Sequence, residues 1–202
     1  MRILLAGTAL LLVAACSQEA PVNEAPSTRP PPIAEPVPTP VPASPAAANV
    51  LTANGFGPLR IGMTRAEVEA ALGADANPNA VGGADPASCD QFRPARAPDG
   101  MLVMINDGVL TNVSLVRAST VQTDRGVKIG DPASKVTGAY GSAAEAIPHK
   151  YESAPAQYIF VWSGADHTSR AARGIKYEIG QDGNVKSIAG GGPTIAYVEG
   201  CA

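Results

Sequence analysis

The chain has 202 residues, of which 45% are hydrophobic and 16% are charged, and its formal net charge is −3 at pH 7. Nucleic acid is excluded as an expected partner, because proteins that bind it carry clustered Lys and Arg to neutralise phosphates, and the charges here are scattered. With 154 residues after position 48, the chain is long enough for one domain with a substantial core.

The first fifteen residues have the layout of an export signal. Arg2 supplies a positive charge, and the apolar run from Ile3 to Val13 is shorter than the roughly 20 residues of a transmembrane helix. Leu12-Val13-Ala14-Ala15-Cys16 resembles the lipobox of bacterial lipoproteins. The resemblance implies cleavage before Cys16, acylation of Cys16 and anchoring in a lipid bilayer. The same resemblance implies sorting to the outer membrane, with the domain in the periplasm, because Ser17 and not Asp follows the cysteine. The alternative is an ordinary secretory signal with a cysteine near its cleavage site.

A proline-rich segment follows Cys16, so residues 16–48 are predicted to be a lipidated tether. Ten of the 32 residues from 17 to 48 are proline. Proline removes backbone donors and fixes φ, so the segment favours extended polyproline II over a packed fold. At roughly 3.1 Å per residue it spans up to about 100 Å, which suits a spacer. Its Pro-x-x-Pro matches, such as Pro42 to Pro45, also fit grooves that bind proline-rich peptides.

An internal repeat sets the expected architecture of residues 49–202. Residues 59–73 align without gaps with residues 127–141, at an offset of 68. In each copy an apolar-basic-apolar triplet predicts a short strand, a glycine predicts a turn, and a helix follows. Val68, Ala71 and Leu72 form an apolar helix face, matched by Val136, Ala139 and Tyr140 in the second copy.

Start and stop signals bound both predicted helices. In the first copy Thr64 is the expected N-cap and Glu67 its partner in a capping box. In the second copy Asp131 is the expected cap, with Pro132 at the first helical position. Gly73 and Gly141 stand where each helix should end.

After each helix the pattern changes to the period of two that is typical of strands. Val113 and Leu115, with Val109, are expected to face the core. Turns are expected at Asn106-Asp107-Gly108 and at Asp182-Gly183. The predicted strands are Met101–Ile105, Val109–Val116, Tyr158–Ser163, Ile175–Ile179, Val185–Ile188 and Ile195–Val198. The expected fold class is therefore α+β, with two tandem units of a helix and an antiparallel sheet over residues 49–120 and 121–202.

Gly62-Met63-Thr64, followed by Glu67-Val68 and Leu72-Gly73, resembles the opening helix of the SmpA/BamE lipoproteins of the outer-membrane assembly machinery. The order of elements is also similar to the β-lactamase inhibitor protein (BLIP) fold, in which the unit occurs twice. These resemblances imply a tandem fold of this kind and a protein-binding function. Two departures stand out: assembly lipoproteins of this kind carry one unit, and the tandem inhibitor is not lipidated and has its disulfides within units. The cysteines that remain here, Cys89 and Cys201, are expected to form one disulfide that joins the units.

No motif for chemistry emerges from the polar residues. His167 next to Asp166, with Glu152 nearby in sequence, could serve as a base or a metal ligand, but the two histidines, His149 and His167, lack ligand spacing. No Gly-x-Ser-x-Gly elbow or phosphate-binding loop is present. We therefore expect no catalytic residue, no metal and no small-molecule cofactor.

Aromatic residues concentrate in the second half, and three of them alternate along one predicted strand. Tyr158, Phe160 and Trp162 should share one face. That face either packs against the second helix as core or forms an exposed strip that binds a partner. Ile159 and Val161 occupy the opposite face.

These observations favour a lipid-anchored, non-catalytic binding or scaffold lipoprotein of the bacterial cell envelope. An accessory in envelope assembly, bound to another envelope protein, is the sharpest form of this hypothesis. A periplasmic enzyme inhibitor is the alternative, and an exposed, concave aromatic sheet face would favour it. A cell-wall hydrolase is a third hypothesis, which spatial clustering of His149 and His167 would favour.

Overall fold

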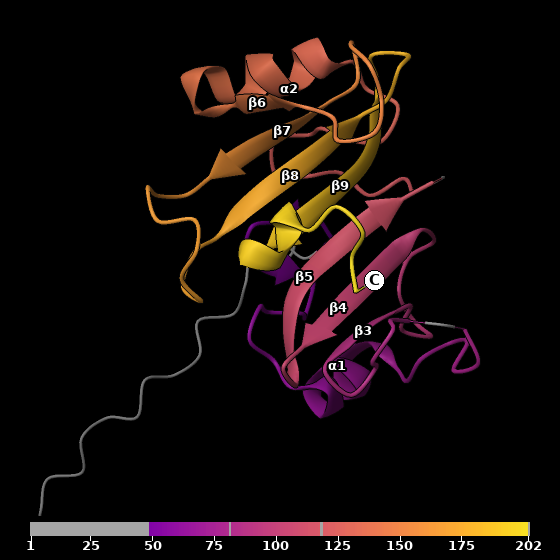
Figure 1. The fold of residues 1–202 in the computed structure, drawn as a ribbon. Helices are drawn as coiled ribbons and strands as arrows, with labels where there is room; N and C mark the ends of the chain where they lie inside the picture. Colours follow the sequence, from indigo (N-terminus) through magenta and orange to yellow (C-terminus); the bar gives the residue numbers. More distant parts are fainter. Residues whose placement is uncertain (1–48, 81, 118, 202) are drawn as a thin grey trace, which may run out of the picture. The chain divides into compact units, whose positions relative to one another are not determined.

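The computed structural model describes residues 49–80, 82–117 and 119–201. The predicted export signal, Cys16 and the tether lie outside the described residues. Figure 1 shows a mixed helix-and-sheet fold, as predicted, built on a seven-stranded antiparallel sheet of order β3-β4-β5-β9-β8-β7-β6. The strands of this sheet are β3 (Cys89–Phe92), β4 (Met101–Asn106), β5 (Val109–Val116), β6 (Glu145–Pro148), β7 (Gln157–Trp162), β8 (Gly174–Ile179) and β9 (Val185–Gly191). The other elements are β1 (Leu51–Thr52) and β2 (Gly55–Phe56), which pair with each other, α1 (Arg65–Leu72), α2 (Ala133–Tyr140), and the short 3-10 helices η2 (Gly141–Ala143) and η3 (Pro193–Ala196).

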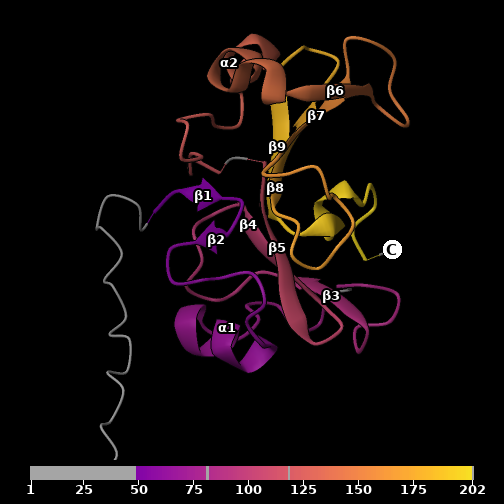
Figure 2. The same cartoon turned by 90° about the vertical axis from the view of Figure 1, so that its left-hand side faces the viewer.

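The main hydrophobic core lies on one face of the sheet, which we call the helix side. Val68 of α1 and Val136 of α2 are both fully buried there, against strand residues such as Val113 and Ile159. Figure 2 shows β1, β2 and α1 on this side of the sheet and η3 with the C-terminal end on the opposite side, which we call the outer face. No helix in the described ranges is long and apolar enough to span a membrane.

The helix boundaries follow the predicted signals, with one correction. Thr64 and Glu67 form the predicted capping box at α1. At α2, Pro132 is itself the N-cap residue and no side chain caps the helix. The carboxylate of Asp131 instead accepts from the Lys128 backbone N–H and from Lys135 Nζ, both within 2.8 Å. The prediction that Asp131 caps the second helix is therefore wrong, because the helix begins one residue later than its sequence signal indicates.

Each helix is anchored by the same pair of backbone hydrogen bonds. Gly62 N–H donates to the Leu110 carbonyl, and Leu110 N–H donates to the Met63 carbonyl. Gly130 N–H likewise donates to the Val185 carbonyl, and Val185 N–H donates to the backbone carbonyl of Asp131. These bonds tie the turn before each helix to the start of β5 or β9. The triplets 59–61 and 127–129 were expected to be strands, but they are irregular, because Leu59 and Val127 are buried without a ladder on either side.

The predicted meander strands are confirmed within a few residues, and Asp107 and Gly108 make the β4–β5 turn with positive φ. One inward position is wrong: Leu110 is fully buried, whereas Val109 is half-buried. The cause is a bulge, since Met104 pairs with Asn112 and Ile105 with Leu110.

The predicted last strand, Ile195–Val198, is also wrong. Pro193 begins η3 instead, and Ile195 is buried against the outer face. Strands β3 and β6, which the sequence pattern did not indicate, form the two edges of the large sheet.

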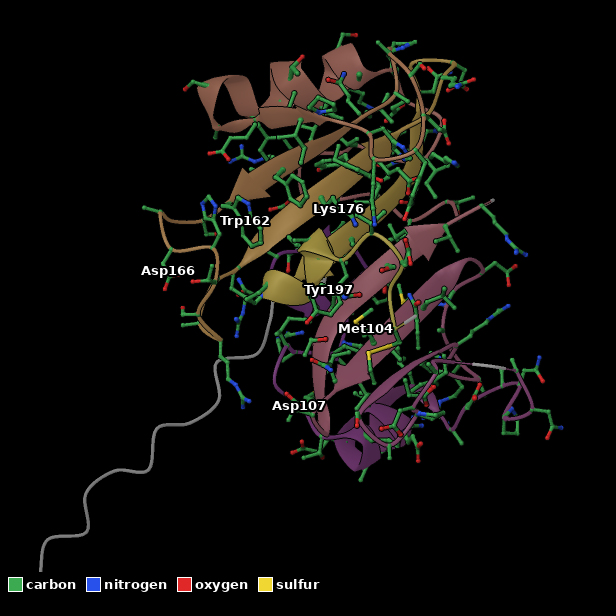
Figure 3. All side chains as sticks on the ribbon, viewed as in Figure 1. Met104, Asp107, Trp162, Asp166, Lys176 and Tyr197 are labelled. Carbon is green, nitrogen blue, oxygen red and sulfur yellow. A yellow bond between two sulfur atoms is a disulfide. The ribbon has the colours of Figure 1, made fainter. Side chains whose placement is uncertain are left out.

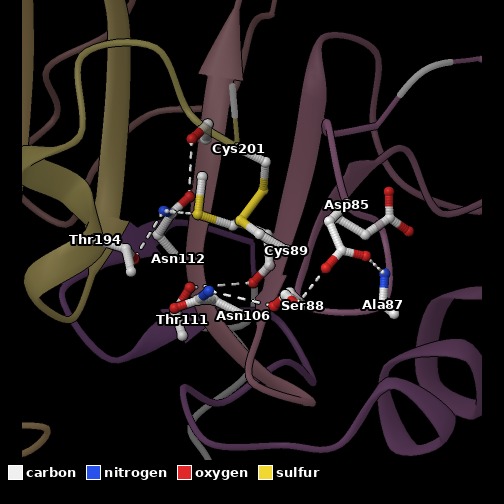
Figure 4. The surroundings of a disulfide bond; sticks show 12 residues. Asp85, Ala87, Ser88, Cys89, Asn106, Thr111, Asn112, Thr194 and Cys201 are labelled. Atoms are coloured by element: carbon white, nitrogen blue, oxygen red, sulfur yellow. Dashed lines mark hydrogen bonds between the residues drawn. A yellow bond between two sulfur atoms is a disulfide. The ribbon is translucent and has the colours of Figure 1, made fainter.

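The predicted disulfide is present. Cys89 of β3 and Cys201 are bonded, with their Cα atoms 5.4 Å apart (Figure 4). Ala84 N–H also donates to the Cys201 carbonyl. The bond holds the C-terminal segment, residues 193–201, against the half of the sheet that contains β3.

Candidate functional site

The outer face carries a continuous row of neighbouring rings, which we call the aromatic row: His149, Tyr158, Phe160, Trp162 and His167. Each pair is stacked except Tyr158 and Phe160, whose rings are tilted. Successive ring centroids along the row lie 4.5, 6.5, 5.9 and 4.7 Å apart. The three central rings come from alternate positions of β7, which places them on one face. The two histidines, from the loops on either side of β7, close the ends of the row.

The expectation that this face packs against the second helix is wrong. Ile159 and Val161 point to the helix side and pack in the core with Val136 of α2. Tyr158 and Phe160 are buried instead by Ile195 of η3 and Ala189 of β9. The alternating pattern correctly predicted which residues share a face of the strand. It could not predict that the C-terminal segment covers this face.

Trp162 is half-buried and stands next to His167 in the row (Figure 3). Its ring lies directly over the backbone of Gly174, where a Cβ atom would stand 2.6 Å from Trp162 Cε3. His167 stacks on the ring at an interplanar angle of 12°. The glycine and the histidine thus hold the indole between them.

His149 has both ring nitrogens engaged. Its Nδ1 accepts the backbone N–H groups of Tyr151 and Glu152, at 3.2 and 3.1 Å. Its Nε2 faces Glu178 Oε1 at 3.4 Å, and with Nδ1 as the acceptor, Nε2 is the nitrogen that donates to this carboxylate. The ring therefore has no nitrogen left to take a proton from a substrate.

Glu178 is the hub of a small polar cluster on β8. It accepts from Ser187 Oγ at 2.7 Å and lies 3.5 Å from Lys186 Nζ. Burial alone would raise the pKa of Glu178, but the hydrogen bonds from Ser187 and His149 and the charge of Lys186 outweigh it, so that its pKa is lowered. The carboxylate separates Ser187 from His149, so the histidine does not activate the serine.

His167 does not pair with the acidic residues near it in sequence. Asp166 accepts from the backbone N–H groups of Thr168 and Ser169, and hydrogen bonds from Ser169 and Thr168 hold its pKa well below the usual range. Glu152 forms an ion pair with Lys186 at 3.0 Å. Within the described ranges, no group of three or more His, Cys, Asp or Glu residues is placed to hold a metal ion.

Exposed apolar side chains border the aromatic row. The large hydrophobic residues that stand exposed in the described part of the chain are Ile147, Tyr151, Tyr197 and Val198. Ile147 pairs with Tyr158 across β6 and β7, and Tyr151 lies beside His149. Tyr197 and Val198 belong to the C-terminal segment that covers the outer face.

The C-terminal segment is fastened along its length. Asn112 Nδ2 donates to Thr194 Oγ1 at 3.0 Å (Figure 4), and Lys176 Nζ donates to the Tyr197 carbonyl at 2.8 Å (Figure 3). Tyr151 and Lys150 both contact the Glu199 carboxylate. A cavity of about 300 Å³ remains between residues 194–200 and the outer face. Lys176 lines this cavity, and its burial lowers the pKa of the ammonium.

No family model, no curated protein and no solved structure matches this chain. The proposed function therefore rests on the sequence and on the geometry of the site. Sequence reasoning had found Tyr158, Phe160 and Trp162, and the structure adds His149, His167 and Lys176 around them. Lys176 had given no signal, because a lysine at an alternating strand position is typical of a solvent-facing residue.

Proposed function

We propose that this domain is a non-catalytic binding module of a lipid-anchored envelope protein, and that it binds a polypeptide partner through the exposed border of the aromatic row. The observation that carries the proposal is the exposure of Ile147 and Tyr151 beside the Tyr158 and His149 end of the row, and of Tyr197 and Val198 on the segment that covers the outer face. Aromatic and aliphatic side chains rimmed by charged pairs are the usual anatomy of a protein interface.

The polar groups of the outer face support binding rather than catalysis. His149 is held by two backbone N–H groups and Glu178, so it works as a structural support for Tyr158. The aromatic rings of the row separate it from His167. A cell-wall hydrolase, which would need a histidine free to move a proton, is less well supported.

An enzyme inhibitor of the BLIP kind remains the second candidate. Its interface would be an open, concave sheet face, but residues 193–201 fill the middle of the outer face. The surface left for a partner is the β6–β7 end, where Ile147 and Tyr151 are exposed. This smaller surface suits a scaffold contact better than the occlusion of an active site.

The repeated anchoring of α1 and α2 supports a finer proposal about the fold. The offset of 68 residues relates Gly62 to Gly130 and Met63 to Asp131, and both pairs bond to the first residues of the last strand in their meander. We propose that the domain consists of two copies of one helix-and-meander unit, similar to SmpA/BamE and BLIP. In this domain the two meanders share one sheet through β5 and β9.

The proposed anchor is Cys16, with residues 17–48 as a tether and the outer membrane as the site of attachment. Replacing Cys16 with alanine should abolish incorporation of labelled palmitate and release the chain from the membrane fraction. A matched Cys89→Ala variant should still incorporate the label. Palmitate labelling that persists in Cys16→Ala would contradict the proposed anchor.

Site-specific photo-crosslinking in cells tests the binding surface. A photoreactive residue at Ile147 and, separately, at Tyr197 should capture the same partner, whereas one at Ser134, which is exposed on α2, should not. The captured protein is then purified and titrated with the full chain.

Substitutions at the exposed border supply the quantitative test. Ile147→Ser and Tyr151→Ala should each weaken binding of the purified partner at least about tenfold, with the melting temperature nearly unchanged, because both side chains are exposed. Lys135→Ala on α2 should bind as the parent does. Equal affinity of all three variants would overturn the proposed interface.

A further inference from the structure

Lys176 is a buried cation. Its exposure is 8%, and it is the one charged residue found buried in the part of the chain that the structure describes. Its ammonium donates to the Tyr197 carbonyl and lies 5.5 Å from the centre of the Tyr158 ring. An ammonium carries three donors, so a single acceptor from the described residues leaves hydrogen-bonding capacity that points into the cavity.

The carboxylates around Lys176 already have partners. Glu178 is bonded to Ser187, His149 and Lys186, and Glu199 is contacted by Lys150 and Tyr151. No carboxylate of residues 49–80, 82–117 and 119–201 forms an ion pair with Lys176. Glu178 is near enough to favour the charged form of Lys176, but it makes no direct contact with the ammonium. Burying an ammonium with unfilled hydrogen-bond donors is unfavourable, and an acceptor in the cavity would relieve that cost.

The cavity beside Lys176 has room for such a ligand, at about 300 Å³. Its walls combine polar and apolar side chains. The polar ones include Gln91, Asn112, Ser114 and Ser187, and the apolar ones include Met104, Ile195 and Val198. Glu178 and Glu199 also line it, and they repel a doubly charged anion about twice as strongly as a singly charged one.

We propose that this cavity binds a single carboxylate on a small, partly apolar body, with Lys176 as its counter-ion. The end of a peptide and a free N-acylated amino acid both present this chemistry. The inference does not rest on the proposed docking surface, because the unfilled donors of Lys176 face the cavity whether or not a partner binds the exposed border of the aromatic row. Either proposal can fail alone.

The test is isothermal titration of the full chain with N-acetyl-alanine, and with N-acetyl-alaninamide as a probe of the same size without charge. Saturable binding of the acid and none of the amide is expected. A third probe, N-acetyl-trialanine with a free C-terminus, separates the two sources: tighter binding than the single residue assigns the site to a peptide end, and equal binding assigns it to a small acid.

Two variants locate the binding. Lys176→Met should lose at least about tenfold in affinity for the acid, whereas Lys128→Met, the same change at an exposed lysine, should bind as the parent does. Should Lys176→Met fail to fold, the ε-methylene resonance of Lys176 in the parent chain, assigned with Lys176→Arg, must shift with the acid and not with the amide. Equal responses to acid and amide, no saturation up to about 50 mM acid, or full affinity in Lys176→Met would each overturn the proposal.

Discussion

Two glycines offer a matched test of how Trp162 is seated. Gly174 lies beneath the indole, whereas Gly138 is exposed on α2 with open space where a Cβ would stand. Alanine at Gly138 should stabilise the domain by about 0.5–1 kcal/mol, because it removes backbone freedom from the unfolded chain and matches helix propensity. Alanine at Gly174 should have the opposite effect.

The size of the Gly174→Ala effect follows from the contact distances. The new Cβ would lie 2.6 Å from Trp162 Cε3 and 3.0 Å from the Val161 carbonyl oxygen. Carbon atoms in contact normally stand about 3.5–4.0 Å apart, so the ring must retreat by about 1 Å. That movement disturbs its stacking on both Phe160 and His167. Overpacking and weakened aromatic contacts together should cost about 1–3 kcal/mol.

Thermal unfolding and tryptophan fluorescence measure both effects. For a domain of this size, 1 kcal/mol corresponds to about 2–4 °C, so Gly138→Ala should raise the melting temperature by about 1–4 °C and Gly174→Ala should lower it by about 2–12 °C. Trp162 is the single tryptophan of the chain, so a change of its emission in Gly174→Ala reports the displaced ring directly. A Gly174→Ala variant with unchanged emission and melting temperature would refute the packing described for the indole.

Three further perturbations have definite expected outcomes. Reducing the Cys89–Cys201 bond, which joins residues 112 positions apart, should lower the free energy of unfolding by up to about 4–5 kcal/mol. Urea titration with and without reductant measures this change. Two free thiols in the purified protein would contradict the bond. Glu178→Gln should cost about 1 kcal/mol at pH 7. Because the folded-state pKa of Glu178 is lowered, this stabilisation is fully present above the ordinary glutamate pKa and is lost as the pH falls through the lower folded value. The stability curves of parent and variant should therefore converge in acid, and a constant difference would refute the assignment. Val68→Ala and Val136→Ala, at fully buried and matched helix positions, should each cost about 2–3 kcal/mol; unequal costs would argue against equivalent helices.

Local signals in the sequence predicted local structure well. The capping box of Thr64 and Glu67 and the Asp107-Gly108 turn depend on neighbouring residues, and both are present. The disulfide was predicted from the cysteine count and from the expected export of the chain, and Cys89 and Cys201 are bonded. The edge strands escaped prediction because Cys89–Phe92 and Glu145–Pro148 lack a clear alternation and owe their conformation to one neighbouring strand each.

The site could be predicted in part. Alternation placed Tyr158, Phe160 and Trp162 on one face, but it does not say which face meets the helices. Ile195 illustrates the difficulty: its apolar neighbours suggested a strand, whereas Pro193 and the space over the outer face favour a 3-10 turn that buries it. The burial of Lys176 depends on the segment around Tyr197, 21 residues further along the chain, and no local pattern encodes it.

The pairing of β5 with β9 at the centre of the sheet has a consequence for how the chain can be made. Synthesis runs from the N-terminus, so Val116 emerges well before Ser187, its partner across the two central strands. Until β9 arrives, β5 presents an open row of backbone donors and acceptors that any other extended chain can occupy. Cys89 must also wait for Cys201, close to the last residue. A chain released or cleaved before β9 therefore leaves β5 as an unpaired, aggregation-prone edge.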